Sequence, residues 1–281
     1  MCRIKITGDS TIDLSKELLT KNNITIFPLY VNMGDDSYRD GVTIVPDDIY
    51  AYVEKTGVLP KTSAPSVGDY LEFFTKVKED ADTVLHFSLG SGFSSSFQNA
   101  RIASEELDNV YVIDSANLST GTGLLVLEAC EMVKKGATAE EIIKEIEKLI
   151  PKVDASFIIH QLDYLAKGGR CSSLVAMGAN VLKLRPTILV KDGKMEVGKK
   201  YRGAYVDCVK NYIKDRLENG EGIRKKRVFI TNTACDGKTL EVAINTVNDL
   251  VNFEEVLHTM ASCTISTHCG ANTLGVLFIR E

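Results

Sequence analysis

The chain has 281 residues, of which 44% are hydrophobic and 25% charged, and this is the composition of a globular protein long enough for two modest domains. Its formal net charge of -5 offers no field that attracts polyanions, so we expect no nucleic-acid partner. The seven cysteines are odd in number and form no CxxC pair, which argues against a disulfide framework and favours reduced thiols in a cytoplasmic protein.

The first half of the chain alternates strand and helix patterns, which predicts an α/β fold built on a parallel sheet. The expected strands are residues 4–6, 24–31, 83–87 and 110–114. The expected helices cover residues 15–22, begin after Val45, Ser66 and Thr138, and run through residues 97–103 and 124–133. Residues 38–41 have the composition of a turn. Because Pro151 ends the alternation, we expect a domain boundary close to it.

The second half begins with a helical pattern that carries Leu162 and Leu165 and ends at Gly168-Gly169, just before Arg170. Two successive glycines let a backbone leave a helix at positive φ and approach another surface closely. We therefore expect Arg170 to be held on a tight corner. A plain helix end with a solvated arginine is the open alternative.

Farther along, the pattern predicts a helix at 172–184, then strands at 187–190 and 195–202 joined by a turn at Asp192-Gly193 as an antiparallel hairpin. A helix up to Leu217, a strand at 228–231 and a helix at 240–250 follow. The last stretch, 256–279, lacks Asp, Glu, Lys and Arg but is interrupted by Gly270. It predicts two strands around a loop at 267–272 and no stable insertion into a membrane. The N-terminal residues carry no export pattern, so we expect no secretion signal.

Two segments are unusually rich in hydroxyl groups. Thr62 and Ser63 are expected on the loop ahead of a helix. Residues 88–96 join a strand to a helix and contain five serines, and a helix N-terminus with serine hydroxyls binds anions well. The open alternative is that these hydroxyls only cap helices and turns.

Several established motifs are incomplete. The glycines at 90 and 92 fall one glycine short of a dinucleotide fingerprint, and His86-x-Ser88-x-Gly90 lacks the first glycine of a nucleophile elbow. The four histidines show no ligand spacing, so we expect neither a metal site nor a cofactor.

A serine hydrolase is the alternative function that spacing alone leaves open. Ser88 or Ser94 as nucleophile, Asp114 and His268 follow the chain order Ser, Asp, His that one class of triads uses.

Taken together, the unusual segments resemble those of the DegV family. They cover almost the whole chain in family order: TGDSTIDL (7–14), YRDG (38–41), TSAPS (62–66), the serine loop ending in FQNA (97–100), VIDS (112–115), LxYLxxGGR (162–170), KxRG (200–203) and HxG (268–270). The resemblance implies an N-terminal parallel-sheet domain, residues 1–152, and a C-terminal α/β domain with a mixed sheet, residues 153–281. It also implies a ligand cavity between them and no catalysis by this chain itself.

The resemblance further implies a fatty-acid-binding protein of the type that serves a fatty acid kinase. Such a protein holds a long-chain fatty acid in an interdomain tunnel and presents its carboxylate to the ATP-dependent kinase, which forms an acyl phosphate for phospholipid synthesis. The carboxylate would meet Thr62, Ser63, Ser94, Ser96 and His268, with Arg170 nearby. Arg202 would lie where the kinase docks, and we expect a monomer when the protein is free.

The acyl tunnel needs an apolar lining with a few hydrogen-bond donors at one end. Candidates for the lining, all of which could instead be plain core, are Ile26, Phe27, Leu29, Phe93, Leu162, Leu165, Leu174, Met177, Val181 and Leu277. The chain departs from the usual family residues at Gly90, Ser95, Ser96, Ala271 and Asn272. Of these departures, the ones at Ser95 and Asn272 remove the backbone freedom of a glycine.

Overall fold

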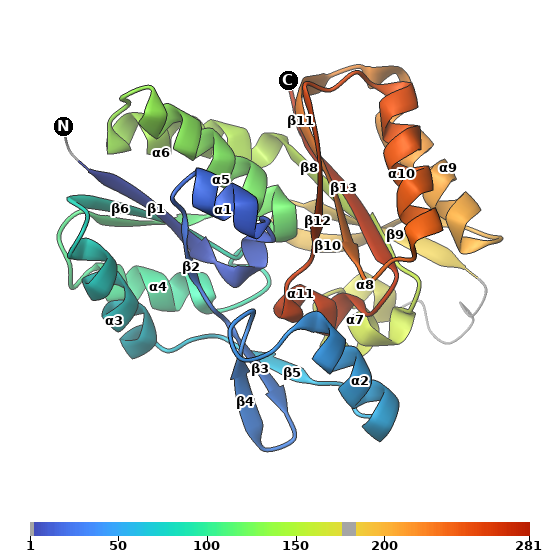
Figure 1. Ribbon diagram of the computed structural model, residues 1–281, viewed down its shortest axis with the longest axis horizontal. Helices are drawn as coiled ribbons and strands as arrows, with labels where there is room; N and C mark the ends of the chain where they lie inside the picture. The colour runs from blue at the N-terminus through green and yellow to red at the C-terminus, as the bar shows by residue number, and fades with distance from the viewer. Residues whose placement is uncertain (1–2, 176–183) are drawn as a thin grey trace.

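The structure is a computed structural model that describes residues 3–175 and 184–281. A parallel sheet of strand order β2-β1-β6-β7 organises the first half (Figure 1). Its strands are β1 (Ile4–Asp9), β2 (Thr25–Phe27), β6 (Thr83–Ser88) and β7 (Val110–Asp114). The helices of this half are α1 (Lys16–Lys21), α3 (Val67–Lys78), α4 (Ser96–Ser104), α5 (Ser119–Lys134) and α6 (Ala139–Leu149). Figure 1 shows α5 and α6 on one side of the sheet and α3 and α4 on the other. The predicted parallel sheet is confirmed.

A mixed sheet of order β10-β9-β8-β13-β11-β12 organises the second half. Its strands are β8 (Val153–Ile158), β9 (Arg185–Lys191), β10 (Lys194–Tyr201), β11 (Ile223–Thr233), β12 (Glu255–Met260) and β13 (Thr273–Arg280). The helices are α7 (Leu162–Gly168), α8 (Ser172–Val175), α9 (Tyr205–Leu217), α10 (Gly237–Leu250) and α11 (Cys263–Cys269). The pairing of β11 with β12 is parallel and that of β9 with β10 antiparallel, so the mixed sheet that the family resemblance implied is confirmed.

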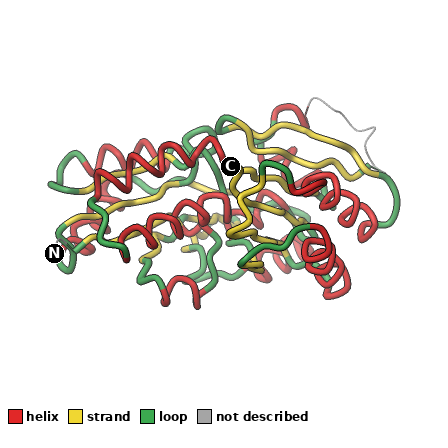
Figure 2. The backbone as a smooth tube through the Cα atoms, turned by 90° about the horizontal axis from the view of Figure 1, so that it is seen from above, coloured by secondary structure: helices red, strands yellow, loops and turns green. Residues whose placement is uncertain are grey.

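Helix α5 joins the two halves. Residues 119–130 of α5 are all buried, as expected of a helix that is covered on every side. The two faces of the mixed sheet are covered differently, as two successive residues of β13 show. Leu277 packs in the core that α5 shares with the parallel sheet, whereas Phe278 packs in the core beneath α9 and α10. The C-terminus lies near the middle of the molecule and the N-terminus at one end (Figure 2).

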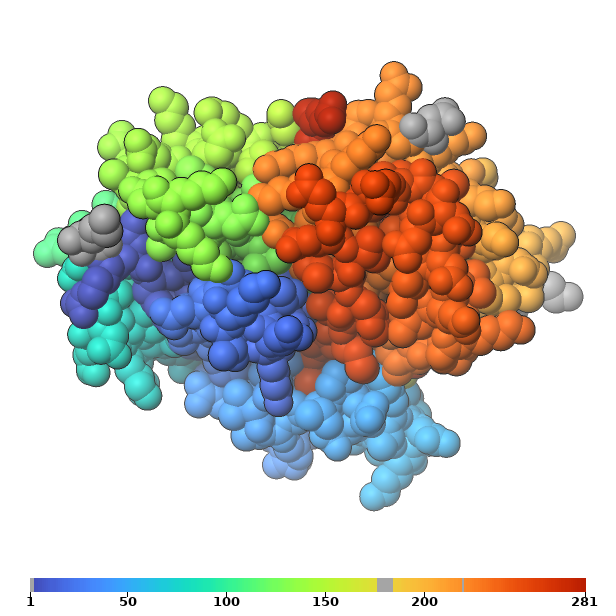
Figure 3. Space-filling view, turned by 45° about the horizontal axis from the view of Figure 1, so that its top comes forward, coloured from blue at the N-terminus to red at the C-terminus, as the bar shows by residue number. Residues whose placement is uncertain are grey.

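A small antiparallel sheet of order β4-β3-β5 lies under both halves with α2 (Pro46–Thr56). Its strands are β3 (Tyr30–Met33), β4 (Asp36–Arg39) and β5 (Lys61–Ser63). The space-filling view shows this blue segment below the junction of the two halves (Figure 3).

This sheet corrects three expectations. The single strand expected at 24–31 is two strands in different sheets, because Pro28 interrupts the ladder between β2 and β3. The expected turn at 38–41 begins as the end of β4. Thr62 and Ser63 lie on β5, paired with Val31 and Tyr30, and not on a loop.

The loop expected at 267–272 is only half right, because residues 267–269 are the end of helix α11 and only residues 270–272 connect it to β13. Ser262 is the N-cap and Gly270, at φ 69°, follows the last helical residue. The helix consists of Cys, Thr, Ile, Ser and His, which are poor helix formers, so its sequence gives little helical signal.

Two local expectations are confirmed. Gly169 has φ 71° at the end of α7, and the Asp192-Gly193 turn has positive φ at both residues, as a tight hairpin requires. Of the helix expected at 172–184, α8 covers the beginning, and residues 176–183 lie outside the described part. The division at residue 152 remains a prediction. No helix in the described ranges is both long and apolar enough to cross a membrane.

Candidate functional site

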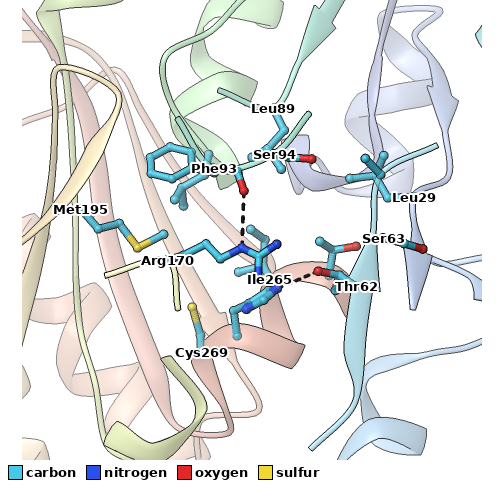
Figure 4. A pocket seen from close by; sticks show the side chains of 14 residues that line it. Leu29, Thr62, Ser63, Leu89, Phe93, Ser94, Arg170, Met195, Ile265 and Cys269 are labelled. Atoms are coloured by element: carbon cyan, nitrogen blue, oxygen red, sulfur yellow. Dashed lines mark hydrogen bonds between the residues drawn. The ribbon is translucent and has the colours of Figure 1, made fainter. Parts of the chain in front are cut away.

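A cavity of about 580 Å³, counted with its open mouth, lies where the two halves meet the small sheet (Figure 4). Segments from across the chain line it: Leu29, Thr62, Ser63, Ala64, Leu89, Phe93, Ser94, Leu118, Arg170, Met195, Thr264, Ile265, His268 and Cys269. The structure therefore brings together five of the predicted carboxylate-site residues, Thr62, Ser63, Ser94, Arg170 and His268.

Thr62 and His268 form the central polar contact of this cavity. Thr62 Oγ1 lies 2.8 Å from His268 Nε2, although 206 residues separate the two in sequence. Strand β5 positions the threonine, and the last turn of α11 positions the histidine. This contact connects the small sheet with the second half of the molecule.

His268 is neutral at physiological pH. Burial, together with the charge of Arg170, lowers the pKa of His268 to about 4. Its Nδ1 has no hydrogen-bond partner among the described residues and packs against Gly168, where an added Cβ would lie 2.5 Å away. Orphaned buried N–H groups are rarer than orphaned acceptors, so we assign the proton to Nε2, which then donates to Thr62 Oγ1 and leaves Nδ1 as the unpaired acceptor. The Thr62 hydroxyl proton is then free to point into the cavity.

Arg170 lies at the mouth of the cavity, on the corner that Gly169 forms. Its Nε donates to the carbonyl of Phe93 at 3.4 Å and its Nη1 to the carbonyl of Gly168 at 2.8 Å. The predicted tight corner is confirmed, and the exposed guanidinium gives the mouth a positive charge.

Ser94 is held by Ser96 rather than by the histidine. The two hydroxyl oxygens are 2.8 Å apart, and the backbone N–H of Ser96 donates to Ser94 Oγ at 3.1 Å. Ser96 is itself fully buried at the start of α4 and does not line the cavity. Its position therefore indicates that it orients Ser94.

The departures from the usual family residues are accommodated by the backbone. Ser95 has an ordinary φ of -77°, so it needs no glycine. Asn272 has φ 60°, a conformation that asparagine tolerates better than most residues. A side chain at Gly90 would lie 2.8 Å from the backbone of Asn117, so this loop conformation requires glycine there.

The predicted tunnel residues fall into several groups. Leu29 and Phe93 line the cavity. Ile26 and Phe27 do not line it. They border a separate groove beside α3, because β2 ends just before Pro28 and Phe27 stacks on Tyr70.

Three leucines are also placed away from the cavity. Leu162 and Leu174 border a groove beside α2, and Leu165 is fully buried in the core around α7. Leucine spacing on a helix does not distinguish core from cavity wall. Met177 and Val181 lie outside the described residues.

A second cavity of about 370 Å³, again counted with its opening, adjoins the first, and the predicted Leu277 lines it. The two share Leu118, Ile265 and Cys269 as walls. From there the second cavity continues between the start of α5 and the inner face of the mixed sheet, along Phe157 and Gly275 among others. The first cavity carries the polar Thr62–His268 contact, and the open surface of the second is almost entirely apolar.

Two buried aspartates, which sequence reasoning missed, hold the N-terminus of α11. Asp40 accepts from the backbone N–H of Cys263 at 2.8 Å and of Thr264 at 3.0 Å. Asp13 accepts from the N–H of Ser262 at 2.8 Å, and burial raises the pKa of its carboxyl to about 7. Both lie in segments quoted for the family resemblance, so that resemblance was the available signal.

The parts of a hydrolytic triad are not assembled. Ser88 is fully buried and donates to Asp9, and Asp114 accepts from the backbone N–H groups of Ser91 and Ala116. No carboxylate of the described chain bonds His268. Within residues 3–175 and 184–281, no group of three or more His, Cys, Asp or Glu is placed to hold a metal ion.

Comparison with known proteins identifies the family. The DegV family profile matches residues 3–281. A DegV domain-containing protein of Clostridium perfringens is 30% identical, with 100% of both chains covered. A Thermus thermophilus structure described as a fatty-acid-binding DegV family protein is 28% identical, covers 99% of this chain and 100% of its own, and has a TM-score of 0.91. A Thermotoga maritima structure, described as revealing fatty acid binding, is 30% identical, with 100% of both chains covered and a TM-score of 0.87. The chain belongs to the DegV family.

Proposed function

We propose that this protein binds a long-chain fatty acid, with the carboxylate at Thr62, Ser94 and His268 and the tail in the adjoining cavity. The observation that carries the proposal is the Thr62–His268 pair in a cavity that adjoins a second, largely apolar cavity between the two halves. The fatty acid binding described for the Thermus and Thermotoga relatives supports it.

The head-group chemistry is that of neutral donors. His268 donates to Thr62, Thr62 donates to one carboxylate oxygen, and Ser94 donates to the other. Arg170 adds a positive charge at the mouth, where it attracts the anion without burying an ion pair. Each charge-assisted hydrogen bond contributes about 1.5–3 kcal/mol.

The tail supplies most of the affinity. It leaves the first cavity between Leu118, Ile265 and Cys269 and enters the second along Phe157 and Leu277. Each buried methylene contributes roughly 0.8 kcal/mol, so a long chain outweighs the head group. The head group then sets the orientation of the ligand.

The finer role that we propose is that of a carrier, not an enzyme. The protein presents the carboxylate to an ATP-dependent fatty acid kinase in the cytoplasm, and the acyl phosphate so formed serves phospholipid synthesis. Arg202, exposed directly after β10, is the proposed docking residue for the kinase. We further propose that the free protein is a monomer.

Extraction of co-purified lipid tests the binding proposal. Protein made in a bacterial host is extracted with organic solvent, and the extract is analysed by mass spectrometry. We expect long-chain fatty acid in near-stoichiometric amount. Recovery of no lipid, combined with no binding of added palmitate, would contradict the proposal.

The carrier role is tested in a reconstituted kinase assay. His268→Ala and Ser94→Ala should lower acyl phosphate formation more than they lower acyl affinity, because they remove orientation and leave the tail contacts intact. Turnover equal to that of the parent in both variants would contradict this role. A serine-directed fluorophosphonate probe should leave the parent unlabelled, whereas a hydrolase would be covalently modified.

A further inference from the structure

Thr264 lines the cavity and carries a buried hydroxyl without a partner among the described residues. The residue lines the cavity and is 5% exposed, and its Oγ1 has no hydrogen-bond partner in the described ranges. The other hydroxyls of the cavity wall are partnered, that of Thr62 by His268, that of Ser94 by Ser96, and that of Ser63 by Asn32 at 3.1 Å. Thr264 is therefore set apart from the donors of the head-group site.

The fold explains why this hydroxyl stays unpaired. A helical threonine usually donates to the carbonyl four residues earlier. Thr264 is the second residue of α11, so that carbonyl belongs to Met260 in strand β12. The backbone N–H of Thr264 donates to Asp40 at 3.0 Å, which holds this end of the helix in place against the cavity.

The place of Thr264 along the helix determines which part of a ligand it meets. It precedes His268 by four residues, which is about 6 Å along a helix axis, on the same face. Ligand atoms beside Thr264 thus lie a few carbons beyond a carboxylate bound at His268. A methylene at that depth offers the threonine hydroxyl no hydrogen bond.

We propose that Thr264 is a specificity-determining residue, and that its hydroxyl favours an acyl chain that carries a hydroxyl group a few carbons from the carboxylate. The inference rests on the proposed function and names its ligand class as hydroxylated long-chain fatty acids. A ligand hydroxyl at this depth restores the hydrogen bond that an unsubstituted chain leaves unmade.

Thr264→Val tests this inference, because valine keeps the shape of threonine and removes the hydroxyl. Delipidated parent and variant are titrated by calorimetry with palmitate and with palmitate hydroxylated at the α, β, γ or δ carbon. We expect at least one hydroxylated analogue to bind the parent about five- to tenfold more tightly, relative to palmitate, than it binds the variant. Palmitate itself should bind the variant at least as tightly as it binds the parent.

Thr267→Val is the matched control. Thr267 is also on α11, is 2% exposed and has a hydroxyl without a partner in the part of the chain described, but it does not line the cavity. The control should leave every affinity ratio as in the parent.

The outcomes separate this inference from the proposed function. Equal affinity ratios in parent and Thr264→Val for all four analogues would overturn the role of Thr264 while palmitate binding upholds the function. A uniform loss for every ligand in Thr264→Val would also overturn it, because Thr264 would then serve the carboxylate. If neither palmitate nor any analogue bound the parent, both proposals would fall.

Discussion

Two histidines, one in each half of the molecule, have opposite surroundings. His86 is fully buried in the parallel sheet, and both ring nitrogens are partnered, Nδ1 with Thr7 Oγ1 at 2.9 Å and Nε2 with Asp9 Oδ1 at 3.3 Å. Asp9 in turn accepts from the hydroxyl of Tyr70 at 2.7 Å and of Ser88 at 2.9 Å. This network is satisfied within the protein.

His268 is satisfied on one side only. Its Nε2 meets Thr62, its Nδ1 faces Gly168 without a partner in the described chain, and the group beside it is the cation of Arg170 rather than an acid. The ring of His86 is fully buried and bonds the carboxylate of Asp9. The ring of His268 lines a cavity and bonds no carboxylate of the described residues. The comparison teaches that the ring of His86 is fully engaged in the fold, whereas the ring of His268 keeps one nitrogen unpartnered among the described residues, beside a cavity.

The largest expected effect comes from breaking the satisfied network. Asp9→Ala should lower the free energy of unfolding by about 3–5 kcal/mol, because it leaves several buried donors without their acceptor. His268→Ala, the matched change at the incomplete site, should cost less than about half as much. Urea denaturation of both variants measures this. Equal losses would mean that His268 is as structural as Asp9.

Two aspartates, Asp9 beside His86 and Asp13 at the start of α11, extend the comparison to pH. Burial acts to raise the pKa of Asp9, but the hydrogen bonds from His86, Leu89 and Tyr70 outweigh it, so the pKa is lowered. Asp13 lacks such a histidine, and burial raises its pKa to about 7. Between its unfolded value and 7, the folded protein binds more protons at Asp13 than the unfolded chain does. The stability contributed by Asp13 therefore falls as pH rises through this window.

Asp13→Asn should remove that pH dependence. The stability difference between parent and variant, measured by urea denaturation from pH 4 to pH 7.5, should shift in favour of the variant by about 2–4 kcal/mol. Taking the difference removes the opposite contribution of His268, whose lowered pKa costs stability as pH falls from about 6.5 to 4. A difference that stays flat over the range would show that Asp13 is ionised throughout.

The smallest effect concerns the packing of His268 itself. Gly168→Ala would place a Cβ 2.5 Å from Nδ1 and push the ring away from Thr62, so we expect palmitate affinity to fall about tenfold, or about 1.4 kcal/mol. Gly237→Ala is the control, since a Cβ there meets nothing within 4 Å. Calorimetry that gives both variants the affinity of the parent would mean that the close approach of Gly168 has no role in binding.

The regular part of the fold was predictable because its signals are local. Strand and helix patterns in alternation predicted the parallel sheet. The helices expected after Ser66 and Thr138 begin there, each with a capping box. Helix α11 was missed because its stability comes from Asp13 and Asp40, which are far away in sequence. The same distance hid Ile265 and Cys269 as cavity walls.

The site was predictable only as far as the family segments reached. Four residues predicted from those segments, Thr62, Ser94, Arg170 and His268, line one cavity. The segments did not distinguish apolar residues of the core from apolar residues that line a cavity. Phe27 and Leu165 are as apolar and as buried as the lining residues, but both pack within the core. That distinction depends on which side chains leave space between them.

The most direct test is the electron density of the interdomain cavity in crystals of protein that retains its lipid. The account predicts a carboxylate within hydrogen-bond distance of Thr62 Oγ1 and Ser94 Oγ, with the tail passing Ile265 and ending along Leu277. A ligand that lies in the groove between β2 and α3, or one whose carboxylate points away from Thr62 and His268, would contradict it.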